Sequence, residues 1–89
     1  MNKNRISEVK SHFKKSLEKN GKYEIFSKKT GKIKLIKHYF RNSLNGQYIF
    51  FWDNGQVMLK GNFKNNKRIG EWLNYDINGE VIFKEFYYF

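Results

Sequence analysis

The feature that most constrains this chain is one sequence pattern that occurs three times between Gly21 and Phe89. Each copy begins with a glycine, carries an aromatic residue two positions later, and carries another aromatic three positions after that. A second glycine follows, with a β-branched residue two positions beyond it. Repeats of roughly 20–50 residues are typical of arrays of one supersecondary unit. The glycine pairs are Gly21 and Gly31, Gly46 and Gly55, and Gly70 and Gly79.

Each copy is most simply two strands joined by a tight turn. Asn54-Gly55 and Asn78-Gly79 are favoured hairpin dipeptides, because both residues adopt positive φ at low cost. After the second glycine, apolar residues alternate with other residues, which predicts that these apolar side chains lie on one face of the strand. Lys37 and Gly61 interrupt these series and indicate a bulge or a strand end. Residues 42–46 and 65–70 are expected to be loops between hairpins. The alternating residues are Ile33, Leu35 and Tyr39 in the first copy, and Val57, Leu59 and Phe63 in the second.

The first twenty residues have a different period. Ile6, Val9, Phe13 and Leu17 recur at helical spacing and form one narrow apolar stripe. We therefore predict a mainly β (α+β) fold in a single domain, residues 1–89. It comprises an N-terminal amphipathic helix over 4–20 and a six-stranded antiparallel meander. The meander is built of three hairpin repeats, at about 21–45, 46–69 and 70–89.

Composition and spacing argue against several chemistries. The absence of cysteine excludes disulfides and thiolate sites. His12 and His38 do not stand at metal-ligand spacing, and Asp53 and Asp76 fall in expected turns. We therefore expect no catalytic site, no metal and no cofactor. No apolar run reaches the ~18 residues of a membrane span, and the first residues lack the apolar segment of a signal peptide. A cytoplasmic protein is the corresponding expectation.

The net charge of +10 lies entirely in the first half of the chain. Residues 1–41 hold thirteen basic and three acidic residues, whereas residues 42–89 hold five of each. A one-sided positive field is typical of proteins that bind nucleic acid, an acidic protein or an anionic membrane. A solvated lysine-rich face is the alternative. The candidate binding residues are Lys10, Lys14 and Lys15 on the predicted helix, and Lys28, Lys29, Lys32, Lys34, Lys37 and Arg41 on the first hairpin.

The aromatic residues divide into two groups. Those that recur at repeat positions are expected in the core: Tyr48, Phe51, Phe63, Trp72 and Tyr75. Phe50 and Trp52 depart from the repeat, so they are candidates for stacking on bases or packing on a partner. Covering by the N-terminal helix is the alternative for these two.

The C-terminal stretch FKEFYYF is expected to form an edge strand. An apolar edge strand is prone to pair with another chain. The sequence therefore indicates a homodimer through this strand, or addition of a partner's strand to it.

The pattern G-x-W/Y-x-x-Y/F-x-x-x-G-x-V/I, followed by an aromatic, N-x-x-x-x-G and a restart, resembles MORN repeats. The likeness is greatest to the bacterial variant of YwqK-type antitoxin proteins, and the segment NFKNNKRIGEWLNYDINGEVIFKEFYY carries it best. It covers residues 21–89, with KKTG and SLNG as departures in the first copy. The resemblance implies serial hairpins in one twisted sheet, used as a scaffold or binding surface without shared catalytic residues.

Charge segregation on a small repeat scaffold favours a non-enzymatic binding protein. The leading hypothesis is an inhibitor, of antitoxin or anti-defence (anti-CRISPR-like) type, that binds a nuclease or another nucleic-acid-handling enzyme or its RNA–protein complex. The alternative is a stand-alone, sequence-tolerant RNA- or DNA-binding protein. Attachment to a membrane as a peripheral scaffold is a third reading, which the narrow apolar stripe disfavours.

Overall fold

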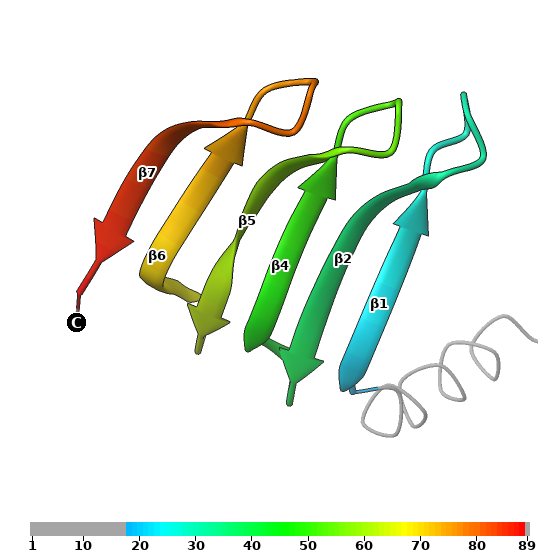
Figure 1. The fold of residues 1–89 in the computed structure, drawn as a ribbon. Helices are drawn as coiled ribbons and strands as arrows, with labels where there is room; N and C mark the ends of the chain where they lie inside the picture. The colour runs from blue at the N-terminus through cyan, green and yellow to red at the C-terminus, as the bar shows by residue number, and fades with distance from the viewer. Residues whose placement is uncertain (1–17, 89) are drawn as a thin grey trace, which may run out of the picture.

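The computed structural model describes residues 18–88, which form one antiparallel sheet of seven strands and contain no helix. Six long strands follow one another across the sheet in the order β1-β2-β4-β5-β6-β7, and the short β3 pairs with β2 (Figure 1). The strands are β1 (Gly21–Phe26), β2 (Ile33–Phe40), β3 (Ser43–Leu44), β4 (Gly46–Phe51), β5 (Val57–Lys64), β6 (Lys67–Tyr75) and β7 (Val81–Tyr87).

The predicted mainly β architecture and its antiparallel meander are confirmed, with β3 as an additional strand. The predicted helix over 4–20 lies outside the described residues except for its last three, and these are not helical. Their backbone is instead bonded to the turn that follows β2. The Lys19 N–H donates to Asn42 Oδ1 at 2.9 Å, and the Asn42 N–H donates to the Lys19 carbonyl at 3.0 Å.

The tight turns lie at the opposite end of the sheet from the one expected. Arg41-Asn42 and Asn65-Asn66 all have positive φ, between 48° and 68°, as two-residue type I′ turns require. The predicted loops at 42–46 and 65–70 are therefore a sharp turn followed directly by strand. At Asn54-Gly55 and Asn78-Gly79 only the glycines have positive φ. These hairpins close with longer loops, in which a turn precedes a left-handed glycine.

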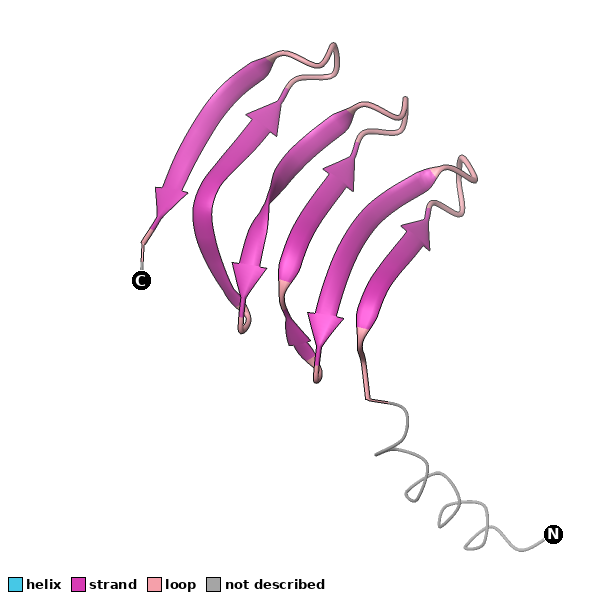
Figure 2. Ribbon diagram, turned by 60° about the horizontal axis from the view of Figure 1, so that its bottom comes forward, coloured by secondary structure: helices cyan, strands magenta, loops and turns pink. Residues whose placement is uncertain are grey.

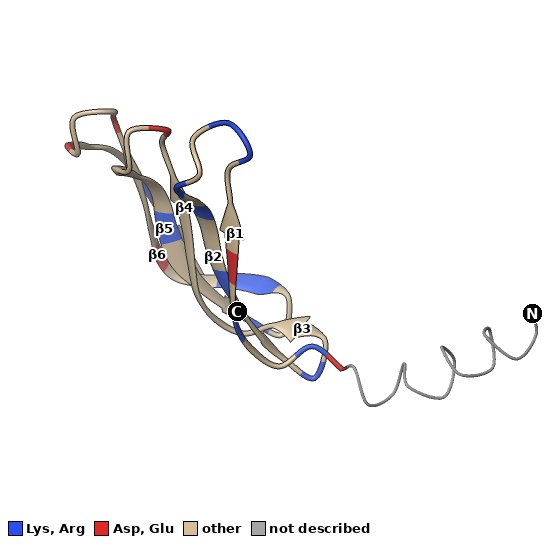
Figure 3. Ribbon diagram, turned by 90° about the vertical axis from the view of Figure 1, so that its right-hand side faces the viewer, with Lys and Arg blue, Asp and Glu red and all other residues tan. Residues whose placement is uncertain are grey.

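Within residues 18–88 the sheet is a single layer, with no second layer over either face (Figures 2 and 3). Within a strand, neighbouring side chains point to opposite faces, so two aromatic residues three positions apart cannot share one. Tyr48 and Trp72 therefore lie on the face called here the aromatic face, and Phe51 and Tyr75 lie on the other. The expectation that all five recurring aromatics form one core is wrong. Only Trp72 is a buried large hydrophobic residue among those described.

The indole of Trp72 lies flat across the backbone of Gly61 on the neighbouring strand β5. A Cβ at Gly61 would fall 2.0 Å from Trp72 Cδ2, so no other residue fits there. The strand pairing is irregular at this point, between Lys60 and Asn62. The interruption of the apolar series at Gly61 thus marks both a bulge and a place for the indole ring. The Trp72 Nε1–H donates to the Asn62 carbonyl at 3.2 Å.

Asparagine side chains bond each sharp turn to the two residues that precede the first glycine of the same copy. The Arg41 N–H donates to Asn20 Oδ1 at 2.8 Å, and the equivalent Asn65 N–H donates to Asn45 Oδ1 at 3.1 Å. Likewise the Leu44 N–H donates to Asn66 Oδ1 at 2.8 Å, as Lys19 does to Asn42. Each turn therefore holds the beginning of its own repeat, which fixes the register of successive hairpins.

Gly61→Ala should destabilise the sheet by about 3 kcal/mol, the upper end of typical overpacking penalties, because the new methyl group overlaps the indole. Urea denaturation followed by far-UV circular dichroism measures this. In a Trp72→Leu background the same change should cost much less, since the ring is gone and the two sites are coupled. Equal costs in both backgrounds would contradict the stacking.

Asn66→Ala should cost about 1–2 kcal/mol and Asn66→Gly roughly half of that. Both variants lose the bond from Leu44, but only alanine is also strained at the φ of 68°. Thermal unfolding of the two variants checks the order. Asn62→Ala, at an exposed position on β5, is the control and should leave the midpoint unchanged.

Candidate polyanion-binding surface

Three hairpin loops lie side by side at one end of the sheet (Figures 1 and 2). They are loop 1 (residues 27–32), loop 2 (52–56) and loop 3 (76–80). Loop 1 carries lysines, whereas loops 2 and 3 carry acidic residues, as the edge-on view shows (Figure 3). Part of the positive charge of the first half thus lies at one end of the row of loops.

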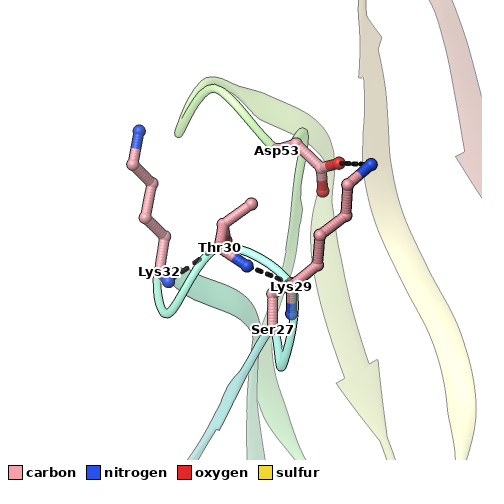
Figure 4. A network of polar contacts seen from close by, with 5 residues as sticks. All are labelled: Ser27, Lys29, Thr30, Lys32 and Asp53. Carbon is pink, nitrogen blue, oxygen red and sulfur yellow. Dashed lines mark hydrogen bonds and ion pairs between the residues drawn. The ribbon is translucent and has the colours of Figure 1, made fainter.

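Loop 1 is held by the side chain and backbone of Ser27 (Figure 4). Its Oγ accepts hydrogen bonds from the N–H groups of Lys29 and Thr30, both at 3.2 Å, and its carbonyl accepts one from the Gly31 N–H at 2.8 Å. The Lys32 N–H donates to Thr30 Oγ1 at 3.2 Å. These hydrogen bonds hold the backbone of the inserted KKTG turn and so fix the positions of the Cα atoms from which its lysine side chains extend.

The lysine side chains of loop 1 differ in direction and in the groups that they contact. The Lys29 ammonium lies 3.6 Å from Asp53 Oδ2 of loop 2, and both side chains are largely exposed. Lys32 leaves the loop in another direction (Figure 4). Regular alternation along one strand would place Lys32 and Lys34 side by side, but Lys32 precedes β2 and the β1–β2 pairing skips Lys34 at a bulge. The regular alternation of side chains between the two faces of β2 therefore does not continue from Lys34 back to Lys32.

A second group of cations surrounds Tyr39 on the aromatic face. The ammonium groups of Lys19 and Lys37 each lie 5.1 Å from the centroid of the Tyr39 ring. The ring of Tyr23, from β1, meets Tyr39 edge-on at 5.2 Å. Farther along the same face, at the loop 1 end of β2, Lys34 lies 6.0 Å from the centroid of the Phe50 ring. Three lysines and three aromatic rings thus form one surface, called here the lysine–tyrosine surface, at the β1–β2–β4 end of the sheet.

Lys37 lowers the pKa of Tyr39 below the usual value for a tyrosine. A hydrogen bond from Lys37 is the largest cause, and the charges of Lys37 and Lys19 act in the same direction, while partial burial opposes them. Anionic oxygen is therefore favoured at this point of the surface. That preference is the electrostatic property a phosphate-binding site needs.

The third repeat also places a cation beside a tyrosine ring, but there a carboxylate balances the positive charge. Arg68 takes the repeat position of Lys19 and lies 4.5 Å from the centroid of the Trp72 ring. It donates to the Tyr87 hydroxyl at 3.2 Å, and that hydroxyl donates to Glu85 Oε2 at 2.9 Å. Glu85 takes the repeat position of Lys37. The first repeat therefore has two cations on its tyrosine where the third has a cation and a carboxylate.

The structure groups the sequence-predicted candidates unevenly. Lys34 and Lys37 join the lysine–tyrosine surface, and Lys28, Lys29 and Lys32 belong to loop 1. Arg41 lies in the turn after β2, where its guanidinium is 5.4 Å from the centroid of the Phe40 ring. Lys10, Lys14 and Lys15 lie outside the described residues.

Phe50 and Trp52 are both half-buried, which bears on their predicted role. Phe50 pairs with Leu35 on one side and Leu59 on the other, so its ring belongs to the sheet as well as to the surface. The Trp52 Nε1–H donates to the Tyr75 carbonyl at 3.2 Å and so links the second repeat to the third. Packing within the sheet accounts for their departure from the repeat pattern.

Lys19, Tyr23 and Tyr39 also belong to this surface, although they were not among the residues predicted from the sequence. Lys19 falls within the predicted helix over 4–20. The available signal was the repeat alignment, because Lys19 and Arg68 both stand two residues before the first glycine of a copy. The basic residue shared by these two copies is therefore a sequence signal for the position of Lys19.

Comparison with known proteins adds no relative. No protein-family model, curated protein or solved structure matches the chain. Among residues 18–88, no cluster of histidine, cysteine and acidic side chains could hold a metal ion. The same residues contain no helix of the length and apolarity needed to cross a membrane. The candidate site therefore depends on the geometry of this chain alone.

Lys37→Met should raise the pKa of Tyr39, because the hydrogen bond and the nearest charge are lost while burial still opposes ionisation. A pH titration of the Tyr39 ring signals by NMR measures the change. Lys60→Met, on the other face of β5, is the control and should leave the titration unchanged. An unshifted Tyr39 in Lys37→Met would contradict the geometry.

Proposed function

We propose that this chain is a non-catalytic binding protein that attaches to a nucleic-acid-handling enzyme, or to its RNA–protein complex, and inhibits it. The observation that carries the proposal is the excess charge around Tyr39. Lys19 and Lys37 flank this ring, and no ion pair joins either of them to a carboxylate among residues 18–88, although the same repeat positions around Tyr87 include Glu85. The scaffold does not require the excess, which therefore points to a partner.

The chemistry of the lysine–tyrosine surface suits a phosphate backbone. Lysine ammonium groups contact phosphates without a sequence requirement, and half-exposed aromatic rings can stack on unpaired bases. Only three of the eighteen basic residues are arginine, the residue that reads guanine edges with paired hydrogen bonds. These features favour recognition of backbone and shape over recognition of sequence.

The opposite face supports a protein component in the partner. Phe26 and Phe40 are 55% and 58% exposed, and they lie at the two ends of the first hairpin. Both rings are accessible to a protein partner that packs along this hairpin. A partner that offers both phosphate groups and apolar surface would use more of the first repeat than bare nucleic acid would.

The test compares three forms of the full chain in affinity purification from the native host, with and without nuclease treatment. The wild type should recover a nucleic-acid-handling enzyme together with its RNA. Lys34→Glu/Lys37→Glu should lose it, and the matched control Lys60→Glu/Lys67→Glu, with the same change in net charge, should retain it. A parallel fluorescence titration with single-stranded RNA should show affinity falling at least about tenfold between 50 and 200 mM salt.

Two results would reject the proposal. Equal capture by all three forms would indicate that Lys34 and Lys37 are only solvated surface residues. Recovery of RNA alone, with no enzyme remaining after nuclease treatment, would favour a stand-alone nucleic-acid-binding protein instead.

A further inference from the structure

The two edge strands of the sheet are unpaired within the described residues. β1 pairs only with β2, and β7 pairs only with β6. Edge strands present free backbone donors and acceptors that can pair with another chain. Large apolar side chains accompany them: Ile25 on β1 is 40% exposed, and Ile82 and Phe83 on β7 are 65% and 55% exposed.

The repeat itself defines how a next strand would pair with β7. At both boundaries between repeats, equivalent positions oppose each other. Leu35 opposes Phe50 at the first boundary, and Leu59 opposes Asn74 at the second. The equivalent residue on β7 is Phe83, and the equivalent residue on β1 is Ile25. A second copy placed in the same register would therefore set Ile25 against Phe83, both of them exposed in the single chain.

The adjacent pair in this register is complementary in charge. Within the chain these positions are Ile36 opposite Ile49 and Lys60 opposite Leu73. Between β7 and the β1 of a second copy they become Lys84 opposite Glu24. Directly opposed side chains of opposite charge stabilise antiparallel pairing, and like charges destabilise it. Both residues are exposed.

The loops would also match in charge. Loop 1 contacts loop 2 through Lys29 and Asp53, and loop 2 contacts loop 3 where the Asn54 side chain donates to the Ile77 carbonyl at 2.9 Å. Continuing the row places loop 3 beside loop 1 of the next copy. Loop 3 carries Asp76 and Glu80, whereas loop 1 carries three lysines (Lys28, Lys29 and Lys32).

We propose that copies of this chain associate head to tail, with β7 of one copy pairing with β1 of the next so that the meander continues across the junction. A symmetric β7–β7 pair centred on Lys84 would instead oppose two lysines. Head-to-tail contacts close into rings or extend into filaments, depending on the rotation per copy. This association is independent of the enzyme partner proposed above.

Charge exchange tests the junction in the full chain. Sedimentation velocity over a range of concentrations should show that the wild type self-associates. Lys84→Glu and Glu24→Lys should each weaken association about tenfold, because each places like charges opposite each other at every junction. An equimolar mixture of the two variants should restore it, since each junction between unlike copies regains one acid and one base.

Three outcomes would overturn the proposal. They are a wild type that remains monomeric at every concentration, a Glu24→Lys variant that associates as strongly as the wild type, and a mixture that associates no better than its components. The second outcome would indicate an interface formed by β7 alone. Because both side chains are exposed, unchanged urea midpoints for the two variants exclude misfolding as the cause of weaker association.

Discussion

The contact between Trp72 and Gly61 is the constraint on which the rest of this sheet depends. Among residues 18–88 no second layer packs on the sheet, so the apolar side chains described there are buried against the sheet itself. Because Gly61 has no side chain, the indole of Trp72 packs directly on its backbone. The rings of Phe63, Tyr48 and Tyr87 surround the indole, with centroid distances of 5.1, 5.9 and 6.4 Å. This cluster joins the second repeat to the third. The first repeat lacks it, because Lys37 occupies the position equivalent to Gly61. The second and third repeats thus bury the aromatic cluster, whereas the first repeat carries accessible charge at the equivalent position.

The period of the sequence was sufficient to predict the meander, because spacing between glycines and alternation along strands are local properties. The turns were predicted at the wrong end for an equally local reason. Asn-Gly is a strong signal for a type I′ turn, yet Asn54-Gly55 closes a longer loop. The type I′ turns have Arg41-Asn42 and Asn65-Asn66, which are held by asparagines from the start of each repeat. Contacts made about twenty residues away in sequence decided the turn type. Dipeptide preference does not contain that information.

The candidate site was predictable in its charge but not in its arrangement. Thirteen basic residues against three acidic ones in residues 1–41 indicated a polyanion-binding region. The grouping of Lys19 and Lys37 around Tyr39 depends on the pairing of β1 with β2 and on the turn that holds Lys19. The bulge at Lys34 could not be located from alternation either, although it separates Lys34 from Lys32. Strand register and bulges, rather than composition, determine which lysines share a face.

The two proposals place different demands on the first repeat, and the geometry allows both to be met. Head-to-tail pairing uses the outer edge of β1 and the lysines of loop 1, whereas the Tyr39 ring and its two lysines lie on a face of the sheet. Association would therefore leave the lysine–tyrosine surface open and repeat it along one face. With six long strands per copy and about 4.8 Å between strands, successive surfaces would lie about 29 Å apart. Sites repeated at that spacing gain from simultaneous engagement only when the partner spans several of them. An extended polyanion such as RNA meets that condition, and a small anionic ligand does not.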